Sequence, residues 1–148
     1  MGGSDFTNRT RRTLHAAGDE AAALGHEYVG TEHILLALLH DGHSAAACLL
    51  TKLGSDIGGI EAQIKAIVKP GTSTIPAGTG RPYTSRAMRV LELAMRCARD
   101  DNRAPVGTQH LLLGLVREGK GIAAQVLTQS GVTDALVADA LGTVEDVP

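Results

Sequence analysis

The sequence predicts an all-α fold of about eight helices, arranged as two four-helix repeats related by a pseudo-twofold axis. First, Val29–Leu39 returns as Val106–Val116, and this shift of 77 residues holds without a gap over residues 6–54, with about 19 of 49 positions identical. Second, the chain is 43% hydrophobic but only 2% aromatic, and a core of Leu, Ile, Val and Ala suits packed helices better than a sheet. Third, apolar residues recur at three- and four-residue spacing, and no segment has a convincing strand pattern.

The first repeat covers about residues 6–69 and contains four predicted helices. Each helix is expected to begin at a capping side chain and to end at a glycine or a polar turn. The predicted boundaries are Thr7 to Gly25, Thr31 to Asp41, Ser44 to Gly54, and Asp56 to Val68.

A linker is predicted over residues 70–82, because its Pro, Gly and Thr content is incompatible with a helix. The second repeat covers about residues 83–141 and follows the same plan. The acidic tail, residues 142–148, is expected to be mobile. The predicted helix starts of the second repeat are Thr84, Thr108, Gly121 and Thr133.

Composition argues against several kinds of partner. A formal net charge of −2 and the lack of aromatic platforms give no basis for nucleic-acid binding. No run of about 18 apolar residues is present to span a membrane, and residues 1–5 do not resemble a signal peptide. Cys48 and Cys97 lie in Ala-rich helical segments and are expected to be buried free thiols. These features predict a cytoplasmic protein.

Catalytic and metal sites are also not expected. His33, His40 and His43 lack a Cys or carboxylate at metal-ligand spacing, and the recurrence of His33 as His110 favours a structural hydrogen bond near a helix start. No Gly-x-Ser-x-Gly turn is present, and Gly119-Lys120-Gly121 lacks the flanking residues of a phosphate loop. We therefore expect no metal, no cofactor and no enzymatic activity.

A candidate binding site comes from the repeated helix starts. Thr7 and Thr84 begin equivalent helices, and each is followed two residues later by an arginine, Arg9 or Arg86. A helix N-terminus favours an anion, and the arginine adds a cation beside it. Glu32, in the first turn of the neighbouring helix, is available to pair with an external cation. The pattern suits a ligand that carries both signs of charge, although ordinary helix capping also explains each residue.

The same residues carry a resemblance to a known family. Phe6-Thr7-x-Arg9, Gly30–Leu36 and Gly107–Gly119 resemble the two repeats of the amino-terminal domain of ClpC-type Clp unfoldases. The likeness extends from Phe6 to about Leu141. It implies an all-helical double repeat that receives substrates or adaptor proteins for an ATP-driven ring, and that recognises phosphorylated arginine on proteins marked for degradation.

The resemblance implies two sites of unequal strength. Glu32 aligns with the family's acidic residue for the guanidinium group and Thr7 with its phosphate-binding threonine, so the first expected site is Thr7, Arg9 and Glu32. The second is Thr84, Arg86 and Gln109, where an amide replaces the family's carboxylate. Because a hydrogen bond to a charged group is worth about 1.5–3 kcal/mol, we expect the second site to be weakened by roughly tenfold or more.

The leading functional hypothesis is a non-catalytic protein-binding module of the Clp proteolytic system, with substrates, adaptor proteins or a Clp unfoldase as partners. No ATPase module follows Pro148 in this sequence, so an excised domain and a free-standing protein are both open. The alternative is a free-standing decoy or regulator that sequesters cyclic peptides or adaptors of a related unfoldase.

Overall fold

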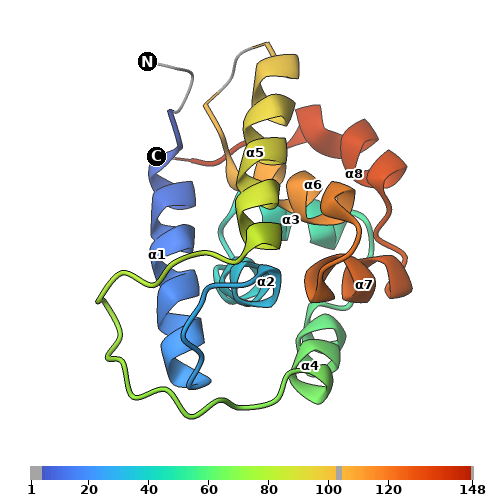
Figure 1. Cartoon of the computed structure of the whole chain (residues 1–148). Coiled ribbons are helices and arrows are strands. Elements are labelled where there is room, and N and C mark those ends of the chain that lie inside the picture. Colours follow the sequence, from blue (N-terminus) through green and yellow to red (C-terminus); the bar gives the residue numbers. More distant parts are fainter. Residues whose placement is uncertain (1–4, 103–104, 148) are drawn as a thin grey trace.

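The computed structural model describes residues 5–102 and 105–147, and within them it contains eight α-helices and no strand, which confirms the predicted fold class (Figure 1). A short 3₁₀ turn, η1, follows the last helix. The helices are α1 (Asn8–Ala23), α2 (Thr31–His40), α3 (Ala45–Lys52), α4 (Ile57–Ile67), α5 (Ser85–Asp100), α6 (Thr108–Glu118), α7 (Ile122–Gln129) and α8 (Asp134–Ala140), and η1 is Leu141–Thr143.

The helix starts follow the sequence closely, with two exceptions. Thr7, Ser44, Asp56, Thr84 and Thr133 each accept a hydrogen bond from a backbone N–H of the first turn, as the sequence predicts. The capping positions of α2 and α6 were predicted wrongly. The residues there are Gly30 and Gly107, and Thr31 and Thr108 are the first helical residues.

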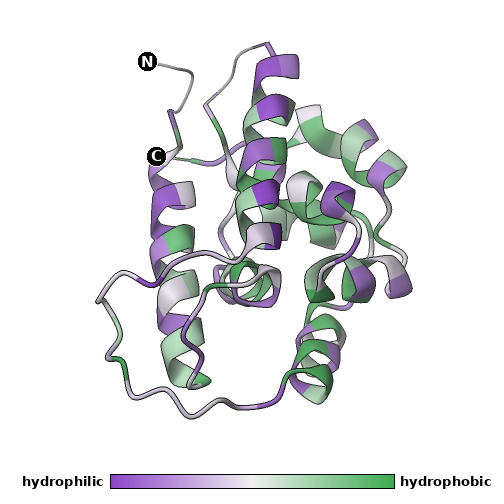
Figure 2. Cartoon of the chain, viewed as in Figure 1, coloured by the Kyte–Doolittle hydropathy of each residue, from purple (hydrophilic) through white to green (hydrophobic). Residues whose placement is uncertain are grey.

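The two most completely buried helices, α2 and α6, lie at the centre of the molecule (Figures 1 and 2). Helix α1 packs on α2, and α5 packs on α6. The third helix of each repeat also contacts the other repeat: α3 packs on α6, and α7 packs on α2 and α4 as well as on α6. Each repeat therefore completes the core of the other, as expected for two units too small to bury their own apolar faces.

Two short parallel contacts join the repeats where their helices begin. The backbone of Phe6 pairs with Val106: Thr7 N donates to Val106 O over 3.1 Å. At the equivalent place Tyr83 pairs with Val29, and Thr84 N donates to Val29 O over 2.9 Å. The start of α1 consequently lies beside the start of α6, and the start of α5 lies beside the start of α2.

The predicted linker contains no helix, but it is tied to the first repeat. Gly71 N donates to Leu24 O over 2.7 Å, and Arg81 donates to the backbone oxygen of His26 over 2.9 Å. Figure 1 shows this segment leaving the end of α4 and passing around the molecule to α5.

The acidic tail, expected to be mobile, makes contacts in the structure: Val144 packs against the core and Asp146 makes four hydrogen bonds with other parts of the chain. The prediction for the two cysteines requires correction. Cys97 is buried as expected, whereas Cys48 is exposed, because it lies on the solvent side of α3.

Within the residues that the structure describes, no single helix is long and apolar enough to cross a membrane. Helices α2 and α3 together have the required length and composition, but the pair is bent by 83°. Both helices are largely buried in the core.

Candidate functional site

The starts of α2 and α6 are held by histidine side chains. His33 Nδ1 accepts a hydrogen bond from Gly30 N over 2.8 Å, and His110 Nδ1 accepts one from Gly107 N over 2.9 Å. His110 Nε2 lies 2.9 Å from Asp101. The predicted structural role of the two equivalent histidines is thus confirmed.

His33 belongs to a chain of hydrogen bonds that requires neutral imidazole rings. Because Nδ1 accepts from Gly30, the Nε2–H of His33 donates to His26 Nδ1 over 2.7 Å, and His26 in turn donates to Lys69 O over 2.7 Å. Burial is the largest cause that lowers the pKa of His33 to about 4, and the electrostatic effects of the neighbouring His26 and Arg81 lower it further. This chain fixes the backbone around Glu32.

Glu32 lines a hollow of about 400 Å³ at the start of α2, which we call the Glu32 pocket. The Glu32 carboxylate folds back over Gly30, two residues earlier in the chain: a Cβ atom at Gly30 would lie only 2.5 Å from Glu32 Oε1. The pocket is formed by the starts of α2, α5 and α7 and by the turn before α7. Its lining residues are Gly30, Thr31, Glu32, Thr84, Ser85, Arg86, Lys120, Gly121, Ile122 and Gln125.

One wall of the Glu32 pocket is rich in hydrogen-bond donors. Thr31 and Ile122, the first residues of α2 and α7, line this pocket together with Thr84, and no described residue accepts a hydrogen bond from the amides of Thr31 and Ile122. Arg86 and Lys120 add positive charge at the rim. Helix N-termini and cations together stabilise an oxyanion, while Glu32 supplies the opposite charge.

A second hollow of about 420 Å³ continues on the other side of Glu32 and shares Gly30, Glu32 and Thr84 with the first. Its remaining lining comes from the α1–α2 turn and the linker, including His26, Tyr28 and the segment 71–73. The two hollows are thus adjacent, with Glu32 in the lining of both, and we call them together the groove.

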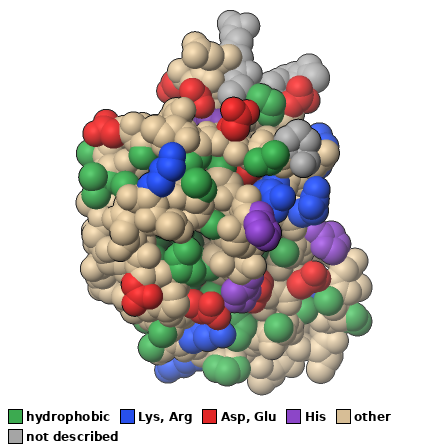
Figure 3. All heavy atoms as spheres, turned by 180° about the vertical axis from the view of Figure 1, so that it is seen from behind, with side chains coloured by type: hydrophobic (Ala, Val, Ile, Leu, Met, Phe, Trp, Pro, Cys, Tyr) green, Lys and Arg blue, Asp and Glu red, His purple; other side chains and the backbone are tan. Residues whose placement is uncertain are grey.

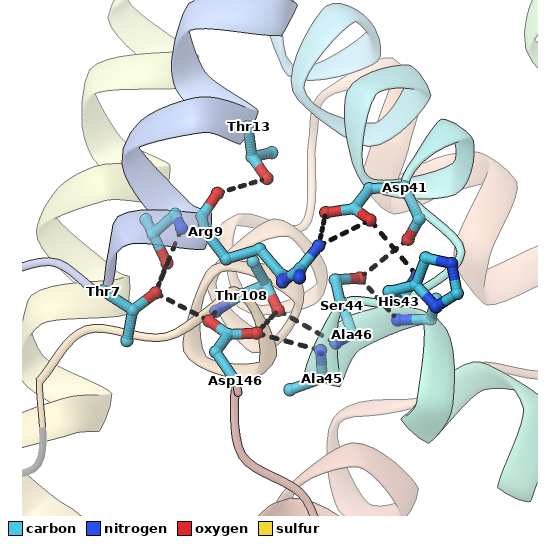
Figure 4. Close-up of polar contacts among 12 residues, drawn as sticks. Thr7, Arg9, Thr13, Asp41, His43, Ser44, Ala45, Ala46, Thr108 and Asp146 are labelled. Atoms are coloured by element: carbon cyan, nitrogen blue, oxygen red, sulfur yellow. Dashed lines mark hydrogen bonds and ion pairs between the residues drawn. The ribbon is translucent and has the colours of Figure 1, made fainter. Parts of the chain in front are cut away.

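The equivalent position at the start of α6 is filled by the tail. Asp146 accepts hydrogen bonds from Thr7 Oγ1 (2.7 Å), Ala45 N (2.9 Å), Thr108 N (2.8 Å) and Thr108 Oγ1 (2.7 Å) (Figure 4). Gln109 follows directly and is only 4% exposed. We call this site the Gln109 pocket, after the residue that follows Thr108 in the chain; Asp146 is bound in it by Thr7, Ala45 and Thr108.

The pairing of the site residues therefore differs from the sequence prediction. Thr7 and Arg9 were grouped with Glu32, and Thr84 and Arg86 with Gln109. In the structure Glu32 shares its pocket with Thr84 and Arg86, and Thr7 lies with Thr108 and Asp146. The cause is that the first helix of each repeat begins beside the second helix of the other repeat: the start of α5 lies beside α2, and the start of α1 lies beside α6. We call this arrangement the exchange between repeats.

The two arginines also have internal partners. Arg9 Nη1 lies 2.8 Å from Asp41 Oδ2, and at the equivalent place Arg86 Nη1 lies 3.4 Å from Glu118 Oε2. The Arg9 side chain is only 18% exposed, whereas Arg86 is 53% exposed. Of the two, Arg86 is thus the one accessible to a ligand.

Sequence reasoning missed Asp146 and Lys120. Asp146 lies outside the repeated segment, and its donors are 38 to 139 positions away in the chain, so no local pattern marks it. In the sequence, Lys120 stands out only as part of Gly119-Lys120-Gly121, which lacks the flanking residues of a phosphate loop. Its place in the turn before α7 could have been found by extending the repeat, since α7 packs against α2.

In the described part of the chain, no group of three or more His, Cys, Asp or Glu side chains is arranged to hold a metal ion. Burial raises the pKa of the Cys97 thiol, with Arg117 beside it opposing the effect. A buried thiol of this kind is a poor nucleophile.

Comparisons with known proteins agree with the geometry. A family model described as the Clp repeat (R) N-terminal domain matches residues 5–143. Over 131 residues the chain is 43% identical to the negative regulator of genetic competence ClpC/MecB of Bacillus subtilis, covering 86% of this chain and 15% of that protein. It is 41% identical to the chaperone protein ClpB of Oceanobacillus iheyensis, covering 86% of this chain and 16% of that protein.

Solved structures show the same fold. The N-terminal domain of ClpD from Arabidopsis thaliana superposes with a TM-score of 0.72 at 25% identity, covering 94% of this chain and 93% of that chain. The N-domain of ClpV from Vibrio cholerae gives a TM-score of 0.79 at 13% identity, covering 96% and 86%. The chain spans about one sixth of the length of the curated relatives it matches. It belongs to the Clp N-terminal domain family, with the double-repeat all-α fold of that family.

Proposed function

We propose that this domain is a protein-binding module without catalysis of its own, and that the Glu32 pocket recognises phosphorylated arginine on substrate proteins. One observation carries the proposal: the pocket holds a carboxylate beside a set of amide and hydroxyl donors and two cations. A phosphoarginine side chain has the complementary arrangement, a phosphoryl group joined directly to a guanidinium group.

The phosphoryl oxygens would be bound by Thr31 N, Ile122 N and Thr84 Oγ1, with Arg86 and Lys120 adding charge. The guanidinium group would pair with Glu32. The continuation of the groove past Glu32, toward Tyr28, gives room for the residue next to the phosphoarginine in an extended peptide.

The relatives support a role in binding polypeptides. One solved neighbour with a TM-score of 0.73 and 14% identity is described as a complex of the ClpV N-domain with VipB peptide. By its place in this family, the present domain would take substrate or adaptor proteins as partners of a Clp unfoldase. On the face seen in Figure 3, hydrophobic side chains are dispersed among polar and charged ones.

Calorimetric titration with a phosphoarginine peptide, and with the same peptide carrying plain arginine, tests the proposal. We expect one strong site for the phosphorylated peptide, and Glu32→Gln should weaken it at least tenfold because the charge-assisted bond to the guanidinium group is lost. Glu92→Gln, an equal charge change on the exposed face of α5, is the control and should leave the affinity unchanged. Equal affinity of wild type and Glu32→Gln would refute the assignment.

The alternative role is a decoy or regulator that captures cyclic peptides or adaptor proteins aimed at a related unfoldase. It predicts tight binding of such a ligand that is indifferent to Glu32→Gln. The same pair of variants, titrated with an adaptor protein or a cyclic peptide, separates the two roles.

A further inference from the structure

Asp146 is bound by three separate segments of the chain. Its Oδ2 atom accepts from Thr7 Oγ1, at the start of α1, and from Thr108 N, at the start of α6. Its Oδ1 atom accepts from Ala45 N, at the start of α3, and from Thr108 Oγ1. Figure 4 shows the carboxylate enclosed between these groups, and Figure 1 shows the tail crossing from α8 to the beginning of α1.

The residues that donate hydrogen bonds to Asp146 are equivalent, in the internal repeat, to residues that line the Glu32 pocket. A shift of 77 positions relates Thr7 to Thr84, Ala45 to Ile122, and Thr31 to Thr108. All three equivalents, Thr84, Ile122 and Thr31, line the Glu32 pocket. The carboxylate of Asp146 thus stands where an external oxyanion would bind in the other repeat.

The residue that follows Thr108 in the chain is the one at which the two helix starts differ, Gln109 in place of Glu32. Gln109 is 4% exposed, and its Oε1 atom has no hydrogen-bond partner among the described residues. A glutamate here would place a second buried carboxylate next to the residue that holds Asp146, at a large cost in desolvation and repulsion. The neutral amide of Gln109 avoids this cost, so it is compatible with a bound Asp146 in a way that a glutamate at the same position would not be.

Asp146 is ionised in this position. Burial alone would raise its pKa, but the hydrogen bonds from Thr108, Ala45 and Thr7 hold the pKa of this carboxyl below its ordinary value. The bound form is therefore the carboxylate, which suits the N-terminal ends of α6 and α3.

We propose that the Gln109 pocket is a carboxylate-binding site whose occupant is the segment 144–147 of the same chain, and that this segment excludes external oxyanions from it. The domain then offers one open pocket and one that is closed from within. The inference goes beyond the proposed function, since it requires no phosphoarginine binding at the Glu32 pocket.

The first test needs no ligand. Amide hydrogen exchange of the full chain, followed by NMR, is measured for Ala45 and Thr108 in wild type, Asp146→Ala and Glu145→Gln. We expect exchange at both amides to rise about tenfold or more in Asp146→Ala, with no change at Thr31 and Ile122. Glu145 is exposed and makes no hydrogen bond within the described residues, so Glu145→Gln controls for the lost charge. Unchanged protection in Asp146→Ala would overturn the proposal.

The second test uses inorganic phosphate as the probe. In wild type, phosphate should leave the Ala45 and Thr108 amides unperturbed, and in Asp146→Ala it should shift both. Gln109→Glu should free the two amides as Asp146→Ala does, with helicity and thermal stability checked to show that the fold is kept. Phosphate shifts at Thr108 in wild type, or none in Asp146→Ala, would contradict the proposal. A failure of phosphoarginine to bind at Thr31 and Ile122 would instead count against the proposed function alone.

Discussion

At the scale of single residues, one pair of equivalent positions separates the two pockets. Glu32 and Gln109 have the same backbone surroundings, since each follows a glycine cap and a threonine and precedes a histidine that binds the glycine amide. Because Glu32 is negatively charged, the Glu32 pocket is suited to a ligand that carries a cation. Because Gln109 is neutral, the Gln109 pocket is suited to a carboxylate, and Asp146 occupies it.

The histidine that supports the Glu32 pocket predicts a pH dependence of stability. His33 has a pKa of about 4 in the folded domain, below the ordinary value of 6.5. The unfolded chain therefore takes up a proton at a higher pH than the folded domain does. The stability that comes from a neutral His33 is fully present above pH 6.5 and is lost as the pH falls toward about 4, which lowers the free energy of unfolding by as much as about 3 kcal/mol.

Urea denaturation at a series of pH values measures this effect. In His33→Gln the free energy of unfolding should change less between pH 6.5 and 4 than in wild type. His15→Gln alters an exposed histidine and should keep the wild-type dependence. If His33→Gln shows the same slope as wild type, His33 is not the group that titrates.

Several residue roles could be predicted from sequence because their partners are close in the chain. Thr7, Ser44 and Thr84 cap helices through contacts three residues away, and the repetition of His33 as His110 indicated a structural role. Asp146 could not be predicted, because all of its donors lie at least 38 positions away and it has no counterpart in the repeat.

At the scale of helices, the two repeats differ in how closely their first two helices pack. Gly114 of α6 faces α5: a Cβ atom there would lie 2.7 Å from Val90 O and 3.2 Å from Ala94 N. The equivalent position in α2 is Ala37, which is buried. The glycine therefore allows a closer approach of α5 to α6 than a side chain at this position would permit.

Two glycine substitutions should have opposite effects on stability. Gly114→Ala should lower the free energy of unfolding by about 1–3 kcal/mol, because the backbone of α5 must move. Gly18→Ala, in α1, should raise it by about 0.5–1 kcal/mol, since no described atom beyond the neighbouring residues and the local helix backbone lies within 4 Å of the added Cβ and alanine favours the helix. Chemical denaturation measures both, and a stabilising Gly114→Ala would show that the α5–α6 contact is not tight.

Helix positions were predictable because apolar spacing and caps are local signals. The starts of α2 and α6 were misplaced by one residue, since glycine with histidine three positions later caps these helices in place of a threonine hydroxyl. Nothing in the local pattern of Gly30-Thr31 distinguishes these two arrangements.

At the scale of the whole molecule, the exchange between repeats determines which residues share a pocket. The sequence shows that the chain is duplicated, but it does not show whether Thr7 lies near its own repeat's Glu32 or near the other repeat's Gln109. The backbone pairing of Phe6 with Val106 and of Val29 with Tyr83 decides the matter. Each pocket is thus built from both halves, so neither half alone would retain a complete site.

We propose that Glu32 and Thr84 together bind a ligand, and that Asp146 closes the equivalent pocket. An NMR titration of the wild-type chain with a phosphoarginine peptide, compared with the plain arginine peptide, examines both parts at once. The phosphorylated peptide should cause specific shifts at the amides of Thr31, Ser85 and Ile122, and none at Ala45 and Thr108. Shifts centred on Thr108, or identical shifts with both peptides, would refute the proposal.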